Sequence, residues 1–208
     1  MKNRRGQRSV VSRTTEGDLE RWYGEGGSQT ATKQPAVTPH DDLRALMVDE
    51  ICDLYDAERQ LAKILPKMAQ GADSMALRAV IENHANETDA QLRRLERAFE
   101  LLHERPRGRH CAGIAGVIEE ESEVLDQDFA GAVRDAAIIA GAQRAEHYEI
   151  GAYGTVIAWA KRLGEAEVAA LLHETLEEEK SVDERLSALA ESRINPDAAS
   201  GNAGNSQR

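Results

Sequence analysis

The sequence predicts an all-α protein made of two antiparallel helical hairpins and a long crossover between them. Hydrophobic residues make up 41% of the 208 residues but aromatic residues only 4%, so we expect an aliphatic core, which suits packed helices better than a sheet. Apolar residues recur at spacings of three, four and seven in four long segments. Two of the connections between these segments are short and one is long, which gives the two hairpins and the crossover.

The first hairpin is expected to begin at residue 38. Thr38 can cap a helix that has Pro39 at its first position, and Gly71 marks the end of that helix. Pro66 is expected to kink or weaken it. A second helix is expected to start near Ser74. The apolar faces of the two helices comprise Leu43, Leu46, Met47, Leu54, Leu61 and Leu65, and then Leu77, Val80, Ile81, Leu92, Leu95, Phe99 and Leu102.

The second hairpin follows a crossover of residues 104–129, in which "GIAGVIEEESEVL" predicts a short helix. A third long helix is expected over about residues 130–163, with Gly164 at its end, and a fourth over about residues 165–192, with Pro196 beyond it. Two helical hairpins joined by one long crossover are the connectivity of the ferritin-like four-helix bundle. We therefore expect that architecture.

Three parts are expected along the chain. Residues 1–37 form a basic N-terminal arm, residues 38–195 form the helical bundle, and residues 196–208 form a C-terminal tail. The arm and the tail are poor in hydrophobic residues and rich in Gly, Ser, Asn or charge, so we expect both to be disordered.

Charge and hydropathy exclude some function classes. The net charge is −11, so the bundle is not expected to bind nucleic acid, which requires Lys and Arg against phosphates. The uncharged stretch between Glu149 and Lys161 holds only 11 residues, too few to span a bilayer. Cys52 and Cys111 form no CxxC pair and are expected to be reduced. A cytoplasmic protein is expected.

An internal repeat places carboxylates at equivalent positions. A shift of 91 residues aligns the two hairpins without a gap and superimposes Glu58 on Glu149 and Glu87 on Glu178. Each of these glutamates lies three, four or seven residues from apolar residues of its helix, which puts it on the apolar face. The pattern predicts one inward-pointing carboxylate from each helix.

A metal site would explain these carboxylates. Burying each one unpaired costs several kcal/mol, and no basic residue is expected to share their faces, because Lys63 and Lys180 lie off them. Carboxylates with an imidazole suit two divalent ions of the iron or manganese type. Glu146 and His84 lie three residues before Glu149 and Glu87 and are predicted as further ligands. Glu177 and Glu179 are expected to form a solvated face.

The segments "DEICDLYDAERQLAKILPKMA", "HANETDAQLRRLE", "VRDAAIIAGAQRAEHYEIGAYGT" and "LLHETLEEEKSVDERLSALA" resemble the bacterial YciF/YciE stress-protein family over about residues 41–192. The resemblance implies a ferritin-like bundle, a di-iron centre and an association with stress response. The ligand pattern departs from the usual ferritin-like Glu-x-x-His, because this chain has His84-x-x-Glu87 and Glu146-x-x-Glu149. On the fourth helix Glu178 is predicted, with Glu174 as a substitute.

The sequence leaves three functional hypotheses open. The first is a dinuclear iron protein that reacts with dioxygen or peroxide, an oxidoreductase of the ferroxidase or peroxidase type. The second is a manganese catalase-like protein, because manganese accepts the same ligands. The third is a structural stress protein, with or without metal, that acts through dimerisation or partners. A homodimer is expected rather than a hollow storage shell.

Overall fold

The computed structural model describes residues 42–129 and 131–201, and within these residues all regular structure is helical. The all-α prediction is confirmed. The four long helices are α2 (Leu43–Gly71), α3 (Met75–Leu101), α5 (Ala132–Leu163) and α6 (Ala166–Leu189). The predicted N-terminal arm, the cap at Thr38 and residues 202–208 of the predicted tail lie outside the described residues.

Asp42 caps the start of α2, since its side chain accepts a 2.7 Å hydrogen bond from the backbone N–H of Ala45. This bond satisfies one of the free N–H groups at the helix start. The helix runs without interruption through Pro66 to Gly71. The predicted start of α3 is confirmed, because the Ser74 hydroxyl caps it by accepting from the backbone N–H of Leu77.

The turn between α2 and α3 is tied to the start of α5. The buried Asp135 carboxylate accepts hydrogen bonds from the backbone N–H groups of Asp73 and Ser74, at 2.8 and 2.9 Å. In return, the Asp73 carboxylate accepts from the backbone N–H of Gly131 at 2.8 Å. These bonds hold the two hairpins together at one end of the helices.

The crossover carries a short helix, as expected. This helix is α4 (Ala112–Asp126), and it packs against α2 and α5. The segment before it is fixed on α2, where the backbone N–H of Arg109 donates to the carbonyl of Cys52 and that of Cys111 donates to the Asp56 carboxylate. The crossover is therefore held along the outside of the helix pair α2 and α5.

The end of α6 differs from the prediction. Gly164, with a φ of 82°, ends α5 in the left-handed conformation that favours glycine. After α6, a turn of π-helix, η1 (Ala190–Ile194), leads into α7 (Asn195–Ala199). The chain is therefore still helical where the sequence analysis placed a disordered tail from residue 196. Pro196 lies in the first turn of α7, where the missing N–H of proline costs nothing.

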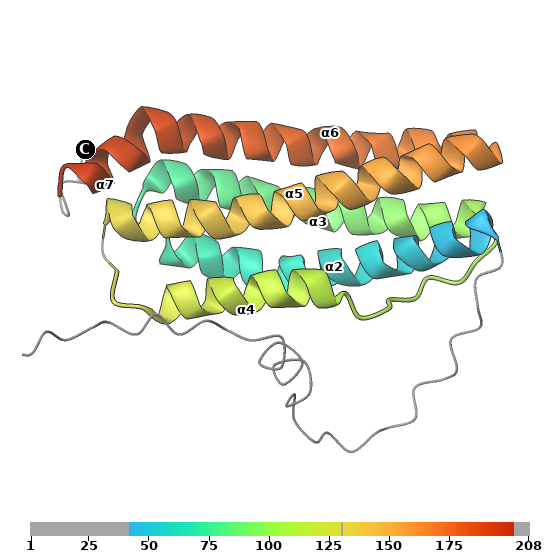
Figure 1. Ribbon diagram of the computed structural model, residues 1–208, viewed down its shortest axis with the longest axis horizontal. Coiled ribbons are helices and arrows are strands. Elements are labelled where there is room, and N and C mark those ends of the chain that lie inside the picture. Colours follow the sequence, from blue (N-terminus) through green and yellow to red (C-terminus); the bar gives the residue numbers. More distant parts are fainter. Residues whose placement is uncertain (1–41, 130, 202–208) are drawn as a thin grey trace, which may run out of the picture. The chain divides into compact units, whose positions relative to one another are not determined.

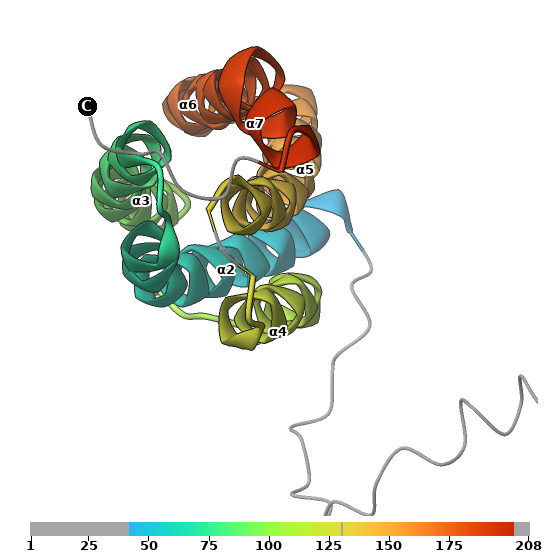
Figure 2. The ribbon, with the colours of Figure 1, turned by 90° about the vertical axis from the view of Figure 1, so that its left-hand side faces the viewer.

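The four long helices form a ring in which α2 packs against α3 and α5, and α6 packs against α3 and α5 (Figure 1). The end-on view shows α4 outside this ring (Figure 2). Inside, the apolar core is divided into two clusters: one holds Leu61, Ile81, Ala145 and Val182, and the other holds Leu54, Leu95, Tyr153 and Leu172. Between these clusters the buried residues are polar: His84, Thr88 and Gln91 on α3, Glu146 and Glu149 on α5, and Glu179 on α6. A polar layer therefore crosses the middle of the core.

Candidate metal centre

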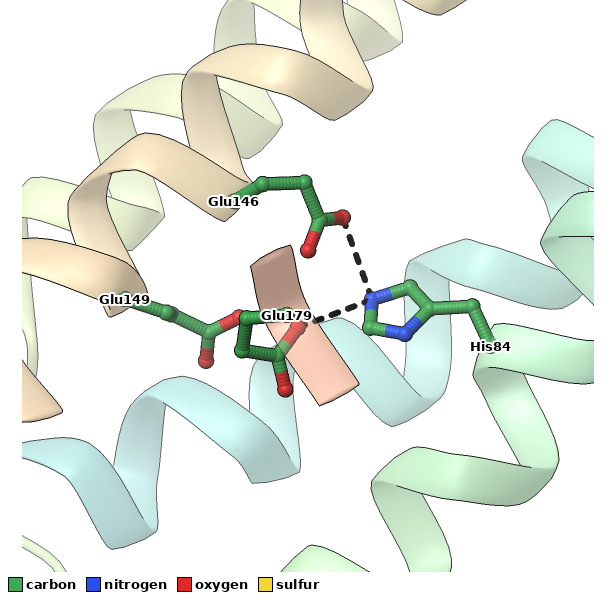
Figure 3. A group of neighbouring side chains, drawn as sticks. All are labelled: His84, Glu146, Glu149 and Glu179. Atoms are coloured by element: carbon green, nitrogen blue, oxygen red, sulfur yellow. Dashed lines mark ion pairs between the residues drawn. The ribbon is translucent and has the colours of Figure 1, made fainter. Parts of the chain in front are cut away.

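The polar layer contains a cluster of four buried side chains from three helices: His84 on α3, Glu146 and Glu149 on α5, and Glu179 on α6. One potential ligand atom from each lies within 4.8 Å of the others. The His84 Nε2 atom is 3.2 Å from Glu146 Oε1 and 3.9 Å from Glu179 Oε2 (Figure 3). The four side chains point toward one common space.

Helical spacing explains why these residues face inward. On α3 the buried residues Leu77, Ile81, His84, Thr88, Gln91 and Leu95 alternate between spacings of four and three. On α6 the same alternation gives Val168, Leu172, Thr175, Glu179, Val182 and Leu186. Residues spaced in this way form one stripe along a helix. The polar members of the cluster therefore occupy core positions of their helices.

Glu58 brings a fourth carboxylate and the fourth helix to this layer. Its side chain on α2 is fully buried, and its Oε1 atom accepts a 2.6 Å hydrogen bond from the Tyr153 hydroxyl. Its Oε2 atom has no hydrogen-bond partner. Glu58 also contributes to the raised pKa of Glu149 through charge repulsion. The polar layer thus holds four buried glutamates and one histidine.

The pKa values show how poorly this layer accommodates negative charge by itself. Burial raises the pKa of Glu58 to about 7, against the Tyr153 hydrogen bond, which lowers it. Burial, together with repulsion from neighbouring glutamates, holds the pKa of Glu149 and that of Glu179 well above the usual value. Burial alone would lower the pKa of His84, but Glu146 raises it well above its usual value. The crowded carboxyl groups favour either protons or a cation.

A divalent cation fits this layer. Buried polar atoms normally have hydrogen-bond partners, yet atoms without a hydrogen bond occur on every member of the layer: Glu58 Oε2, both His84 nitrogens, Glu146 Oε2, both Glu149 oxygens and Glu179 Oε2. The His84 nitrogens lie near carboxylate oxygens instead, Glu87 Oε2 at 3.8 Å from Nδ1 and those of Glu146 and Glu179 at 3.2 and 3.9 Å from Nε2. Among the described residues, no lysine or arginine is buried, so His84 is the single buried base. Carboxylates with an imidazole are ligands suited to iron and manganese. The free atoms and their chemistry therefore agree with a metal site.

Glu87 and Glu178, which we predicted as ligands, are placed outside the cluster. Each is half-buried and paired with an arginine from the facing helix. Arg185 Nη2 lies 3.2 Å from Glu87 Oε2, and Arg94 donates to both oxygens of Glu178, at 2.5 and 2.6 Å. The expectation that no basic residue would share the faces of these glutamates was wrong. Arg94 follows Glu87 by seven residues and Arg185 follows Glu178 by seven, so each arginine lies on the same helix face as a glutamate and reaches the glutamate of the facing helix.

The substitute on the fourth helix, Glu174, is 66% exposed and lies 3.4 Å from the side chain of Arg94, also outside the cluster. Glu179 takes the inward position on this helix. The expectation that Glu179 would form a solvated face was wrong, since it is fully buried and accepts a short hydrogen bond from Gln91. Its signal was in the sequence: Glu179 lies seven residues after Leu172 and seven before Leu186.

Sequence comparison places the helical part of the chain in a known family. A family model described as a domain of unknown function (DUF892) matches residues 42–199. The chain belongs to this family. Protein YciF of Escherichia coli (strain K12) is 40% identical over 157 residues, which cover 75% of this chain and 95% of YciF. The predicted resemblance to the YciF stress proteins is thereby confirmed.

Solved structures extend the DUF892 comparison to the fold. The crystal structure of the E. coli stress protein YciF matches with a TM-score of 0.72 and 37% identity, covering 74% of this chain and 98% of that chain. YcfI from Rhodopseudomonas palustris matches with a TM-score of 0.70 and 38% identity, covering 73% and 98%. Within the described residues, no helix is long and apolar enough to cross a membrane.

Proposed function

We propose that this chain is a ferritin-like, stress-related protein that binds two iron ions and reacts with dioxygen or peroxide. The observation that carries the proposal is the polar layer of four glutamates and His84, contributed by all four long helices and containing unpartnered buried atoms. Two bound ferrous ions would supply two electrons for reduction of the oxidant. Manganese is the alternative metal, because the same carboxylates and imidazole suit it.

The ligand set that we propose is Glu58, His84, Glu146, Glu149 and Glu179. One potential ligand atom from each of the last four lies within 4.8 Å of the others. This is slightly wider than the separation of about 4.4 Å between opposite ligands held about 2.2 Å from a metal, so a small inward movement of the side chains would let them surround one ion. Glu58, whose charge repels that of Glu149, extends the set toward a second ion. Five side chains are few for two ions, so the second ion depends most on Glu58.

The surrounding residues hold these ligands in place. Tyr153 fixes Glu58, and Gln91 donates to Glu179. The arginine pairs keep Glu87 and Glu178 beside the layer rather than in it. The apolar clusters on both sides exclude bulk water from the layer, which strengthens every electrostatic contact inside it. A preorganised ligand set of this kind would leave a bound metal accessible to a small oxidant.

Metal analysis of protein grown in iron-supplemented medium tests the proposal. We expect about two Fe or Mn ions per chain in the wild type and about one in Glu58→Gln, while the matched control Glu178→Gln keeps the wild-type content. Oxidation of the bound iron by peroxide or dioxygen is then followed by absorbance. A wild-type content below about half an ion per chain would refute the metal centre and favour a structural stress protein.

Two further parts of the proposal have their own measurements. Oxygen evolution from peroxide by manganese-loaded protein would support the catalase-like alternative over iron oxidation. A homodimer is expected in solution, and size-exclusion chromatography with light scattering measures it directly. Elution as a large shell would contradict this assembly.

A further inference from the structure

Glu121 is a buried carboxyl group that lies outside the polar layer and, unlike the buried Asp135, has no hydrogen-bond partner. Glu121 is on α4 in the run "EEESE", where its neighbours Glu119, Glu120 and Glu123 are exposed. The Glu121 residue is only 2% exposed, and neither of its carboxyl oxygens has a hydrogen-bond partner. Burial raises the pKa of Glu121 to about 8, against the nearby positive charge of Arg144. The group is therefore mostly protonated at neutral pH.

Gly141 on α5 makes room for this carboxyl group. A Cβ atom added at Gly141 would lie 1.5 Å from Glu121 Oε2, so no other residue type fits there while Glu121 stays in place. Glycine inside a helix costs about 0.5–1 kcal/mol relative to alanine. The chain thus combines an unfavourable helix residue with an unpartnered buried acid at one point of contact between α4 and α5.

A small cavity connects this point with the polar layer. Its lining consists of Leu61, Ile64, Leu65 and Met68 on α2, Val117, Ile118 and Glu121 on α4, and Gly141, Ala142, Ala145 and Glu146 on α5. The only ionisable side chains in the lining are Glu121 and Glu146, and each has an unpartnered oxygen. The volume of about 10 Å³ is close to what one water molecule needs.

We propose that Glu121 is a proton-relay residue, which passes protons between the solvent side of α4 and Glu146 through this cavity. The inference rests on the proposed function. Reduction of peroxide to two water molecules takes up two protons and two electrons, and the bound ferrous iron supplies the electrons. An acid with a pKa near the ambient pH can release a proton inward and regain one from solvent.

The charged surroundings of Glu121 are simple. Arg144 on α5 is the charged group that lowers its pKa, and Glu146 is the ionisable group at the other end of the cavity. The part of α2 that lines the cavity is apolar. A pH dependence that disappears with Glu121 can therefore be assigned to this carboxyl group.

Infrared spectroscopy of the metal-free protein is the first test. In the metal-free wild type and in the matched control Glu119→Gln we expect a protonated carboxyl component that titrates with a midpoint near pH 8, beside the bands of Glu58, Glu149 and Glu179. This component should be absent in Glu121→Gln. Glutamine keeps the size and hydrogen-bonding capacity of the side chain but carries no titrating proton. If subtracting the Glu121→Gln spectra from the wild-type spectra leaves no carboxyl component that titrates near pH 8, the inference is overturned.

The rate of iron oxidation by peroxide is the second test. With metal content unchanged, Glu121→Gln should be slower by at least about a hundredfold and should lose the pH dependence seen between about pH 6.5 and pH 9. Gly141→Ala, which displaces the carboxyl group without removing it, should also be slower. Wild-type rates and pH profile in Glu121→Gln would overturn this inference alone. A wild type that binds no metal would overturn the proposed function and this inference with it.

Discussion

Glu87 on α3 accepts a hydrogen bond of 3.2 Å from Arg185 on α6. The 91-residue repeat converts this pair into Glu178 and Arg94, which also bind each other across the same two helices. The two ion pairs are thus related by the internal repeat. They neutralise two half-buried carboxylates and keep them next to the polar layer, outside the cluster.

The first prediction distinguishes adjacent glutamates on α6. Glu179→Gln should weaken binding of ferrous or manganous ions by at least about tenfold, because it removes a buried carboxylate of the cluster. Glu178→Gln should leave the affinity unchanged and lower the free energy of unfolding by about 1 kcal/mol or less, since it breaks the partly exposed pair with Arg94. Anaerobic calorimetric titration measures both affinities. Equal affinities would contradict the ligand set.

The second prediction concerns Tyr153. Tyr153→Phe removes the 2.6 Å hydrogen bond to Glu58 and leaves both oxygens of that buried carboxyl group without a partner. Metal affinity should fall by about 10–100-fold, the usual effect of removing a group that orients a ligand. Tyr148→Phe is the matched control, since the Tyr148 hydroxyl donates to Asp53 instead. A similar loss in both variants would show that the effect is not specific to Glu58.

The third prediction is that metal-free protein loses stability as pH rises from about 5.5 to about 8. The pKa of Glu58 is raised from 4.5 to about 7, so the folded chain binds more protons than the unfolded chain between these values. Stability then falls with rising pH. Glu149, Glu179 and Glu121 have raised pKa values and act in the same direction, and so does the raised pKa of His84.

Thermal melts of metal-free and metal-loaded protein over this pH range measure the third prediction. Bound metal should reverse the trend, because it favours the ionised ligands and stabilises the folded state by mass action. Glu149→Gln should raise the melting temperature of the metal-free protein at about pH 8 by removing one crowded charge. A melting temperature that does not change with pH in metal-free wild type, metal-loaded wild type and metal-free Glu149→Gln would refute the raised pKa values of these carboxyl groups.

The fourth prediction uses the contact between Glu121 and Gly141. Gly141→Ala alone should lower the free energy of unfolding, because its Cβ atom would overlap Glu121 Oε2. In a Glu121→Ala background the same substitution should raise it by about 0.5–1 kcal/mol, through the higher helix propensity of alanine. Urea unfolding of the four proteins in a double-mutant cycle gives the coupling. Additive effects would mean that the two residues do not touch.

Much of the fold could be predicted from the sequence because it depends on local signals. Ser74 as a cap, Gly164 after α5 and the apolar stripes are recognised within a few residues. The end of the bundle was placed too early, because Pro196 indicates a helix stop but also suits a first helical turn. Local signals alone do not distinguish these two uses of proline.

The site was harder to predict because inward direction depends on a difference of one residue. Glu178 and Glu179 differ by about 100° around the helix, and both are flanked by apolar residues at helical spacings. The pairing of Glu178 with Arg94 decides between them, and it requires the packing of α3 against α6. The burial of Glu121 could not be predicted, because it depends on how α4 packs against Gly141 of α5, and no periodicity in the sequence specifies this packing.

The repeat also has a consequence for the symmetry of the proposed metal centre. His84 and Thr175 occupy equivalent positions of the two hairpins, and so do Thr88 and Glu179, yet only His84 and Glu179 belong to the cluster. A protein assembled from two identical hairpins would have to place the same residue at both positions. When both hairpins belong to one chain, equivalent positions can hold different residues. The two halves of the polar layer can therefore offer different ligand atoms, a nitrogen from His84 in one and an oxygen from Glu179 in the other. If the layer binds two ions as proposed, we expect the two metal positions to be inequivalent and to fill one after the other.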